Sequence, residues 1–304
     1  LTGNNRYAHF NPAIGATFAL LPTMTAYAGV SQDTRTPTAS EIECSDPLRP
    51  CLLPSNLAGD PPNLRQVVGH TVELGVRGRV RTADAAGALS WNLGLFRTDV
   101  DDDIYGIATS VSSGFYQNIG ATRRQGIEAG LNYQSRQWTA YLNYSYIDAA
   151  FESALTLPSP SNPFQDDDGK SSVTAGDRLP GIPQHRIKAG ADLTLLPHWT
   201  AGASLVYVSS QYYFGDESNQ NAPMPGYGGV SLHASYQVGR HLELFGSINN
   251  LFNARYATYG TYSDPTGIGA PGIPLDGETN GPGVDNRFLS PAAPIAVYGG
   301  VRIS

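Results

Sequence analysis

Apolar and polar side chains alternate along most of this chain, so that every second residue belongs to the same chemical class. From Val230 to Val238, apolar residues occupy the even-numbered positions, whereas Ser, His and Gln occupy the odd-numbered ones. The segments 72–80, 138–146 and 187–195 repeat this pattern. Because successive side chains of a strand point to opposite faces, each segment has one apolar and one polar face. The pattern predicts an all-β protein, and no helical period competes with it.

About eleven strands are predicted, and the connections between them alternate between short turns and long loops. The predicted strands are 10–20, 24–33, 71–82, 89–99, 123–134, 137–148, 185–196, 198–209, 227–238, 241–252 and 295–303. The long loops are 34–70, 100–122, 149–184, 210–226 and 253–294. An outer-membrane barrel has short periplasmic turns and long extracellular loops, whereas a soluble sandwich has no reason to place every long loop at one end. The fold class predicted is therefore a transmembrane antiparallel β-barrel.

The three tryptophans of the chain support this interpretation. Trp91, Trp138 and Trp199 each come just after a short turn, and each falls on the apolar face of its strand. An indole is amphipathic and is favoured at the bilayer interface, where one end of the ring is apolar and the other is wet. We expect a periplasmic aromatic girdle in contact with outer-membrane lipid. The alternative is three tryptophans in the core of a soluble sandwich.

Composition excludes several other classes of protein. Only 15% of the residues are charged, against roughly 25% in soluble domains. A mean hydropathy of -0.24 excludes a helical membrane protein. The net charge of -7 excludes nucleic acid as a partner, because a binder needs a basic patch to neutralise phosphates. No nucleophile elbow, zinc-binding helix or phosphate loop is found, so neither an enzyme nor a cofactor is predicted.

The two cysteines lie close together in a proline-containing loop. Cys44 and Cys51 are separated by Ser-Asp-Pro-Leu-Arg-Pro. In an exported protein this spacing indicates a disulfide that closes a small loop. Two reduced thiols in a cytosolic loop are the alternative. No further Cys or His lies nearby at zinc-ligand spacing, so no metal site is predicted here.

Aromatic and arginine side chains of the long loops are the candidate ligand-binding residues. Aromatic planes and guanidinium groups bind large ligands by stacking and by charge-assisted hydrogen bonds. Binding residues also concentrate on loops that a rigid scaffold carries. The alternative is that these rings form an outer aromatic belt or pack the loops together. The candidates are Tyr105, Tyr116, Arg178, Tyr212, Tyr213, Tyr259, Tyr262 and Arg287.

Acidic clusters and histidines have plainer interpretations. Asp99 and the run 101–103 are expected to be a solvated cluster, with a hard-cation site as the alternative. The run 166–168 is followed by Gly169, which permits a tight calcium-binding turn, but no Glu stands at EF-hand spacing. His185 and His233 are expected to be polar residues that face the lumen.

Six segments, in order along the chain, resemble the TonB-dependent outer-membrane receptors. Asn249 to Tyr259 resembles the penultimate-strand signature Asn-Leu-Phe-Asp-x-x-Tyr, and Leu179 to Arg186 resembles a Leu-Pro-x-x-Pro-x-His stretch. The other similar segments are 35–41, 96–104, 125–129 and 298–302. The family ends on an aromatic residue, whereas this chain ends at Ser304. Either one residue is missing or this barrel departs from the rule.

The resemblance implies a 22-stranded barrel with a plugged lumen, of which residues 1–304 form the C-terminal part. The plug domain and the N-terminal segment that engages the TonB complex are expected upstream. The implied function is capture of a scarce nutrient, a ferric-siderophore-like chelate, and its import to the periplasm with TonB-supplied energy. The receptor is expected to be a monomer. A passive porin and a secreted adhesin or lectin-like module are the alternatives.

Overall fold

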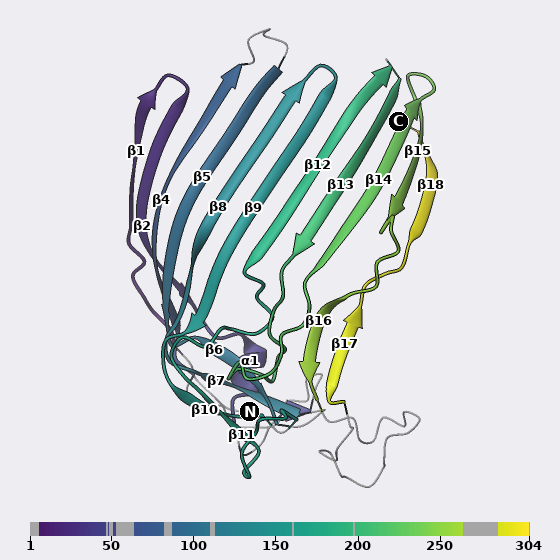
Figure 1. Cartoon of the computed structure of the whole chain (residues 1–304). Helices are drawn as coiled ribbons and strands as arrows, with labels where there is room; N and C mark the ends of the chain where they lie inside the picture. The colour runs from purple at the N-terminus through teal and green to yellow at the C-terminus, as the bar shows by residue number, and fades with distance from the viewer. Residues whose placement is uncertain are drawn as a thin grey trace.

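One antiparallel sheet of eleven strands dominates the computed structural model (Figure 1). The structure describes residues 6–46, 48, 51–52, 64–81, 87–109, 113–159, 161–196, 198–263 and 285–303. The strands of the sheet follow one another in chain order, and all eleven predicted strands are confirmed, with differences only at their ends. They are β1 (Ala13–Leu21), β2 (Met24–Arg35), β4 (Val67–Arg81), β5 (Gly87–Asp101), β8 (Thr122–Ser135), β9 (Trp138–Phe151), β12 (His185–Leu196), β13 (Trp199–Val208), β14 (Tyr227–Gln237), β15 (Leu242–Asn249) and β18 (Ala296–Ile303).

The sheet is open, with β1 at one edge and β18 at the other. Its apolar face is exposed over its whole width. Leu74 of β4 is 52% exposed, Leu95 of β5 is 44% exposed and Leu205 of β13 is 40% exposed. A face of this size that stays uncovered needs an apolar partner, which a lipid bilayer supplies. The predicted alternation is therefore confirmed.

Glycines on the polar face let large side chains of neighbouring strands lie flat against the sheet. The hydroxyl oxygen of Tyr27 (β2) lies 2.5 Å from the point where a Cβ of Gly75 (β4) would stand. The ring of Tyr141 (β9) lies 2.6 Å from the same point on Gly190 (β12). Because glycine has no side chain, the ring of one strand covers the backbone of the next. These ring-on-glycine contacts add packing to a face that no second sheet covers.

His185 does not face the lumen, so this expectation is wrong. Its register partner is Tyr146, and it occupies the same odd-numbered face of β12 as Ile187, which is the apolar face. The His185 ring lies 5.2 Å from the ring of Tyr146, and its Nδ1 is 2.9 Å from the Tyr144 hydroxyl. His233, in contrast, lies on the polar face opposite Gly202.

Smaller elements, which the alternation did not predict, lie at the end of the sheet that carries the long connections (Figure 1). We call these connections and their elements the loop layer. A three-stranded sheet and two hairpins form within it, in the orders β3-β7-β6, β10-β11 and β16-β17. The elements are α1 (Ala39–Glu43), β3 (Cys51–Leu52), β6 (Ile104–Ala108), β7 (Ser113–Asn118), β10 (Leu155–Pro158), β11 (Lys170–Val173), β16 (Ala257–Tyr262) and β17 (Arg287–Pro291). None of the helices in the described residues is long and apolar enough to cross a membrane.

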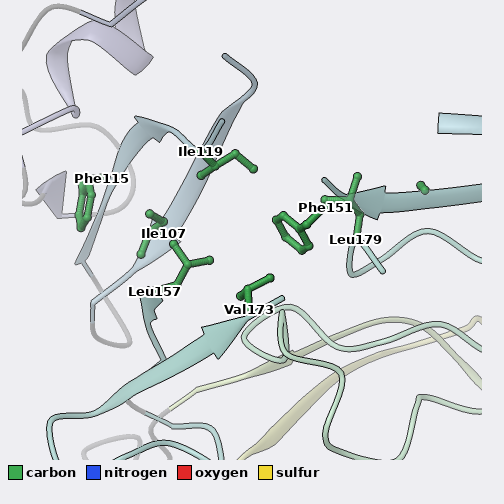
Figure 2. Close-up of a cluster of buried hydrophobic side chains, with 8 residues drawn as sticks. Ile107, Phe115, Ile119, Phe151, Leu157, Val173 and Leu179 are labelled. Atoms are coloured by element: carbon green, nitrogen blue, oxygen red, sulfur yellow. The ribbon is translucent and has the colours of Figure 1, made fainter. Parts of the chain in front are cut away.

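The buried hydrophobic core lies in the loop layer and the strand ends beside it. Figure 2 shows Ile107, Phe115, Leu157 and Val173 converging from β6, β7, β10 and β11, with Phe151 at the end of β9. Phe151 is 0% exposed and Leu157 is 1% exposed. Burial of each such side chain stabilises the layer by about 1.5–3 kcal/mol. The long loops therefore pack against one another in a single layer and are not independent of each other.

Helix α1 begins at a capping box. The side chain of Thr38 accepts a hydrogen bond from the Glu41 backbone N–H, and the Glu41 carboxylate accepts one from the Thr38 backbone N–H. Arg35, the last residue of β2, donates to the same carboxylate at 2.7 Å. These bonds satisfy two of the N–H groups that a helix start leaves without partners. The segment 35–41 thereby fixes the direction in which the chain leaves the sheet.

Candidate functional site

A cavity of about 350 Å³ lies in the loop layer. Its walls come from connections that are far apart in the sequence, since β6, β7, β10, β16 and the segment after β13 each contribute. Six aromatic side chains line it, which are Tyr105, Phe115, Tyr116, Phe214, Tyr259 and Tyr262. The size is within the range of small-molecule sites, which are mostly apolar with a few polar groups. This cavity is the strongest candidate site in the described part of the chain.

Four of the eight predicted ligand-binding residues line this cavity. They are Tyr105 of β6, Tyr116 of β7, and Tyr259 and Tyr262 of β16. Tyr259 is 44% exposed, so its ring is accessible. The structure therefore brings half of the predicted set together.

The other four predicted residues, Arg178, Tyr212, Tyr213 and Arg287, lie outside the lining. The Arg178 guanidinium lies over the ring of Tyr212, 5.4 Å from its centroid. The ring of Tyr213 is buried and lies 5.2 Å from the ring of Tyr262, so it supports the cavity wall from behind. Arg287 donates two hydrogen bonds of 2.8 Å to the two carboxylate oxygens of Asp285.

The charge of Arg287 is already compensated. Its bidentate contact with Asp285 raises the pKa of the Arg287 guanidinium and lowers the pKa of the Asp285 carboxyl. A forked contact of this kind is a strong form of ion pair. The guanidinium is consequently not a free anion-binding group in this structure.

Glu217 provides the charged group of the cavity wall, and sequence reasoning missed it. Its Oε1 accepts hydrogen bonds from the Tyr105 hydroxyl and from the Gly215 backbone N–H, both at 3.0 Å. Glu217 is 6% exposed, and this burial raises the pKa of its carboxyl. Burial likewise raises the pKa of the Tyr105 hydroxyl. The wall thus holds a buried carboxyl beside electron-rich rings.

A second buried carboxyl, Asp216, lies directly beside Glu217 in the chain and was also missed. Asp216 is 0% exposed, and the side chain of Asn221 donates to its Oδ1 at 2.9 Å. Asn162, also 0% exposed, donates to the carbonyl of Gly215 at 2.8 Å. Burial raises the pKa of the Asp216 carboxyl, and these donors lower it in part. The only sequence signal was an Asp-Glu pair directly after Tyr-Tyr-Phe-Gly, and loops carry no periodicity that would interpret it.

Ser159 and Cys44 complete the wall. Ser159 is 3% exposed, and its hydroxyl has no hydrogen-bond partner among the described residues. The carbonyl of Cys44 accepts a hydrogen bond of 2.6 Å from the backbone N–H of Tyr116. Cys44 is disulfide-bonded, and Cys51 is the only other cysteine of the sequence. The side chain of Cys51 lies outside the described residues, so the pairing stays a prediction.

The acidic residues at the end of β5 are ion-paired, which the expectation of a solvated cluster did not include, although the side chains of Asp99 and Asp101 stay 42% and 62% exposed. Asp99 accepts from Arg97 and Arg123 at 2.8 and 2.6 Å, and Asp103 accepts from Arg124 at 2.8 Å. Asp102 pairs with Arg65 at 2.8 Å. Arg97 lies on the same strand as Asp99, whereas Arg65, Arg123 and Arg124 come from other segments, which a linear pattern does not reveal. In the described ranges, no three His, Cys, Asp or Glu side chains are grouped to hold a metal ion.

The tryptophans lie near the short-turn end of the sheet. Trp138 and Trp199 are the first residues of β9 and β13, and each is 44% exposed. Trp91 lies four residues after the start of β5, next to Gly78 of β4. The Trp199 ring contacts that of Tyr236, with centroids 5.1 Å apart. The three rings are thus placed where a girdle would need them.

Residues 1–251 match the family model described as TonB-dependent receptor-like β-barrel. Over 147 residues the chain is 31% identical to the probable TonB-dependent siderophore receptor PiuA of Acinetobacter baumannii, covering 47% of this chain and 18% of that protein. Over 148 residues it is 26% identical to the metal-pseudopaline receptor CntO of Pseudomonas aeruginosa, with the same coverage of 47% and 18%.

Solved structures share the fold. The crystal structure of PiuA from Acinetobacter baumannii superposes with a TM-score of 0.62 at 19% identity, covering 96% of this chain and 35% of that one. The copper transporter OprC superposes with a TM-score of 0.65 at 18% identity, covering 96% and 39%. The chain therefore spans well under half the length of these proteins.

Proposed function

The chain belongs to the TonB-dependent receptor family through its β-barrel, and we propose that the receptor containing it binds a ferric-siderophore-like chelate in the loop layer and imports it. The place of this barrel is the bacterial outer membrane. The family consists of transport receptors rather than enzymes. Import by the complete receptor would deliver the chelate to the periplasm with energy from the TonB complex.

One observation carries this proposal. Four tyrosines, from two hairpins more than a hundred residues apart in the chain, line one cavity of the loop layer. Rings held on a packed scaffold lose little conformational entropy when a ligand stacks on them. The named relatives supply the ligand class, since PiuA is called a siderophore receptor and CntO a metal-pseudopaline receptor.

We also propose how residues 1–304 contribute to the whole receptor. The eleven strands of the open sheet would be the C-terminal part of a barrel of about 22 strands, closed by strands from the rest of the receptor. A plug domain would fill the lumen, and an N-terminal segment would engage the TonB complex. The whole receptor would work as a monomer, as one closed barrel.

Uptake of a radiolabelled ferric chelate by cells that carry the complete receptor tests the proposal. Tyr259→Ala removes the exposed ring of the cavity and is expected to weaken binding by about tenfold, in line with roughly 1–3 kcal/mol for one ring contact. Phe252→Ala is the matched control, because that ring is 74% exposed and lies outside the cavity.

Three results would contradict the proposal. If no ferric chelate is bound by wild-type receptor, the ligand class is wrong. If uptake is unchanged in cells that lack TonB, the receptor acts as a passive porin instead. Equal losses in the two variants would show that the cavity is not the binding site.

A further inference from the structure

The cavity of the loop layer has an unbalanced charge. Among its described lining residues there is no Lys, Arg or His, and Glu217 is the sole ionisable acid other than the tyrosines. Burying a carboxylate away from water is unfavourable unless a cation or several donors compensate it. Two hydrogen bonds to Glu217 end on Oε1, from the Tyr105 hydroxyl and the Gly215 backbone N–H, and both donors are neutral. A cationic donor in the cavity would complete this compensation.

The arginines of the loop layer that were predicted to bind ligand do not compensate the charge of Glu217. Arg287 is held by Asp285 at 2.8 Å, and Arg178 lies over the ring of Tyr212. Neither side chain lines the cavity. An anionic ligand would therefore meet a buried carboxyl without a free cation beside it, and like charges at close range repel each other strongly where water is excluded.

The aromatic walls favour the same sign of charge. The faces of Tyr and Phe rings carry negative electrostatic potential and attract cations, more strongly where water is excluded. Tyr105, Tyr116, Tyr259 and Tyr262 surround the space that Glu217 borders. An ammonium group placed between these rings and the carboxyl would be bound by cation–π contacts and by the carboxylate at the same time.

The hydroxyl of Ser159 is an independent indication of a ligand. Ser159 lines the cavity, is 3% exposed, and its Oγ has no partner among the described residues. Burying a hydroxyl without a hydrogen-bond partner is unfavourable. A polar atom of a bound ligand would supply the missing hydrogen bond.

We propose that this cavity binds an ammonium-bearing arm of the chelate between Glu217 and the tyrosine rings, so that the receptor selects cationic chelates over polyanionic ones. This inference rests on the proposed function, because it names the charge class of the ligand that the receptor imports. It assigns the arm and not the metal centre to the cavity.

Three chelates test the inference on the complete receptor, purified in detergent. The first is a linear ferric trihydroxamate with a free terminal amine, the second is the same chelate with that amine acetylated, and the third is a ferric tris-catecholate. A hydrogen bond between charged groups is worth about 1.5–3 kcal/mol, so the free-amine chelate is expected to bind roughly 10- to 100-fold more tightly than the acetylated one. The tris-catecholate is expected to bind most weakly.

Glu217→Gln keeps the shape of the side chain and removes its charge. In this variant the two trihydroxamates are expected to bind equally. Asp168→Asn is the matched control, since Asp168 is a loop carboxylate that is 78% exposed and lies outside the cavity. It should leave the difference unchanged. The wild-type comparison of chelates needs no variant, so it stands even where Glu217→Gln does not fold.

The outcomes separate the inference from the proposed function. If the tris-catecholate binds as tightly as the free-amine chelate, or if Glu217→Gln keeps the preference for the amine, the charge assignment is overturned while chelate uptake stands. If none of the three chelates binds, both are overturned.

Discussion

Asp192 of β12 and His233 of β14 meet above Gly202 of the strand between them, with 2.5 Å from Oδ1 to Nε2. The three residues are register partners across β12, β13 and β14. A Cβ on Gly202 would lie 2.3 Å from Asp192 Oδ1 and 2.5 Å from His233 Nε2. The absence of a side chain at Gly202 is therefore what allows two strands that do not pair to make direct contact.

Gly202→Ala should separate this pair and destabilise the barrel. Real Cβ atoms do not approach other atoms so closely, so the ends of both side chains must move apart, and loss of this partly exposed pair should cost about 0.5–1 kcal/mol. The measurement is urea unfolding of the complete receptor in detergent, followed by the heat-modifiable band shift. Gly246→Ala on β15 is the control, because its Cβ would be 3.6 Å from the nearest atom, the Tyr298 carbonyl oxygen. Equal midpoints for the two variants would show that the contact contributes nothing.

Arginine substitutions at two neighbouring residues of β13 should differ strongly in how much they destabilise the barrel. Leu205 lies on the exposed apolar face, and Ser204 is on the other face of the same strand, opposite Ser231. Leu205→Arg places a charge in lipid and should cost roughly 2–4 kcal/mol near the bilayer midplane. Ser204→Arg should be mild, since its side chain points to the lumen. Folding yields into lipid vesicles measure both, and matching losses would mean that the facing is misassigned.

The loop layer should be more stable at mildly acidic pH than at neutral pH. Burial raises the pKa of Glu217 above 4.5 and that of Asp216 above 3.8. A raised pKa means that the folded state holds the proton more tightly than the unfolded state. This stabilisation is complete below the ordinary values and is lost as the pH rises through the raised ones.

Limited proteolysis of the segment 210–226 at the two pH values measures this effect. Cleavage is expected to be slower at the acidic pH after correction for the activity of the protease. In the variant that combines Asp216→Asn with Glu217→Gln the difference should disappear, because no buried carboxyl is left to titrate there. A pH difference that survives in this variant would assign the effect to other groups.

Cys44 and Cys51 should be linked to each other in protein taken from the cell envelope. The bond closes a short loop, so its contribution to global stability should be small. Cys44 lines the cavity, so replacing both cysteines with serine should lower ligand affinity and leave the heat-modifiable barrel intact. Mass spectrometry of non-reduced peptides checks the link, and two free thiols would exclude it.

The sequence by itself determined the eleven-strand sheet and the face that each strand presents. Alternation is a local property, and antiparallel neighbours in the sheet are neighbours in the chain. The sequence therefore indicates which face of the sheet carries each side chain, as for Val230, Leu232 and Ala234. His185 follows the same rule, since the odd-numbered positions of β12 belong to the apolar face, and the expectation that it faces the lumen departed from the alternation. The strands and their facing thus needed little beyond local pattern, whereas the register came from the structure.

Only the tertiary structure decided which loop residues form the site. Tyr105 and Glu217 are 112 positions apart and are joined by a hydrogen bond of 3.0 Å. Arg287, which the sequence analysis named as a candidate ligand-binding residue, is held by Asp285, and Asp99 is held by Arg123 of the neighbouring strand. Loops carry no repeating pattern, and their contacts depend on which strands the sheet places side by side. Tertiary packing therefore decides which side chains line the cavity, whereas the alternation of apolar and polar residues is enough to predict the sheet that supports it.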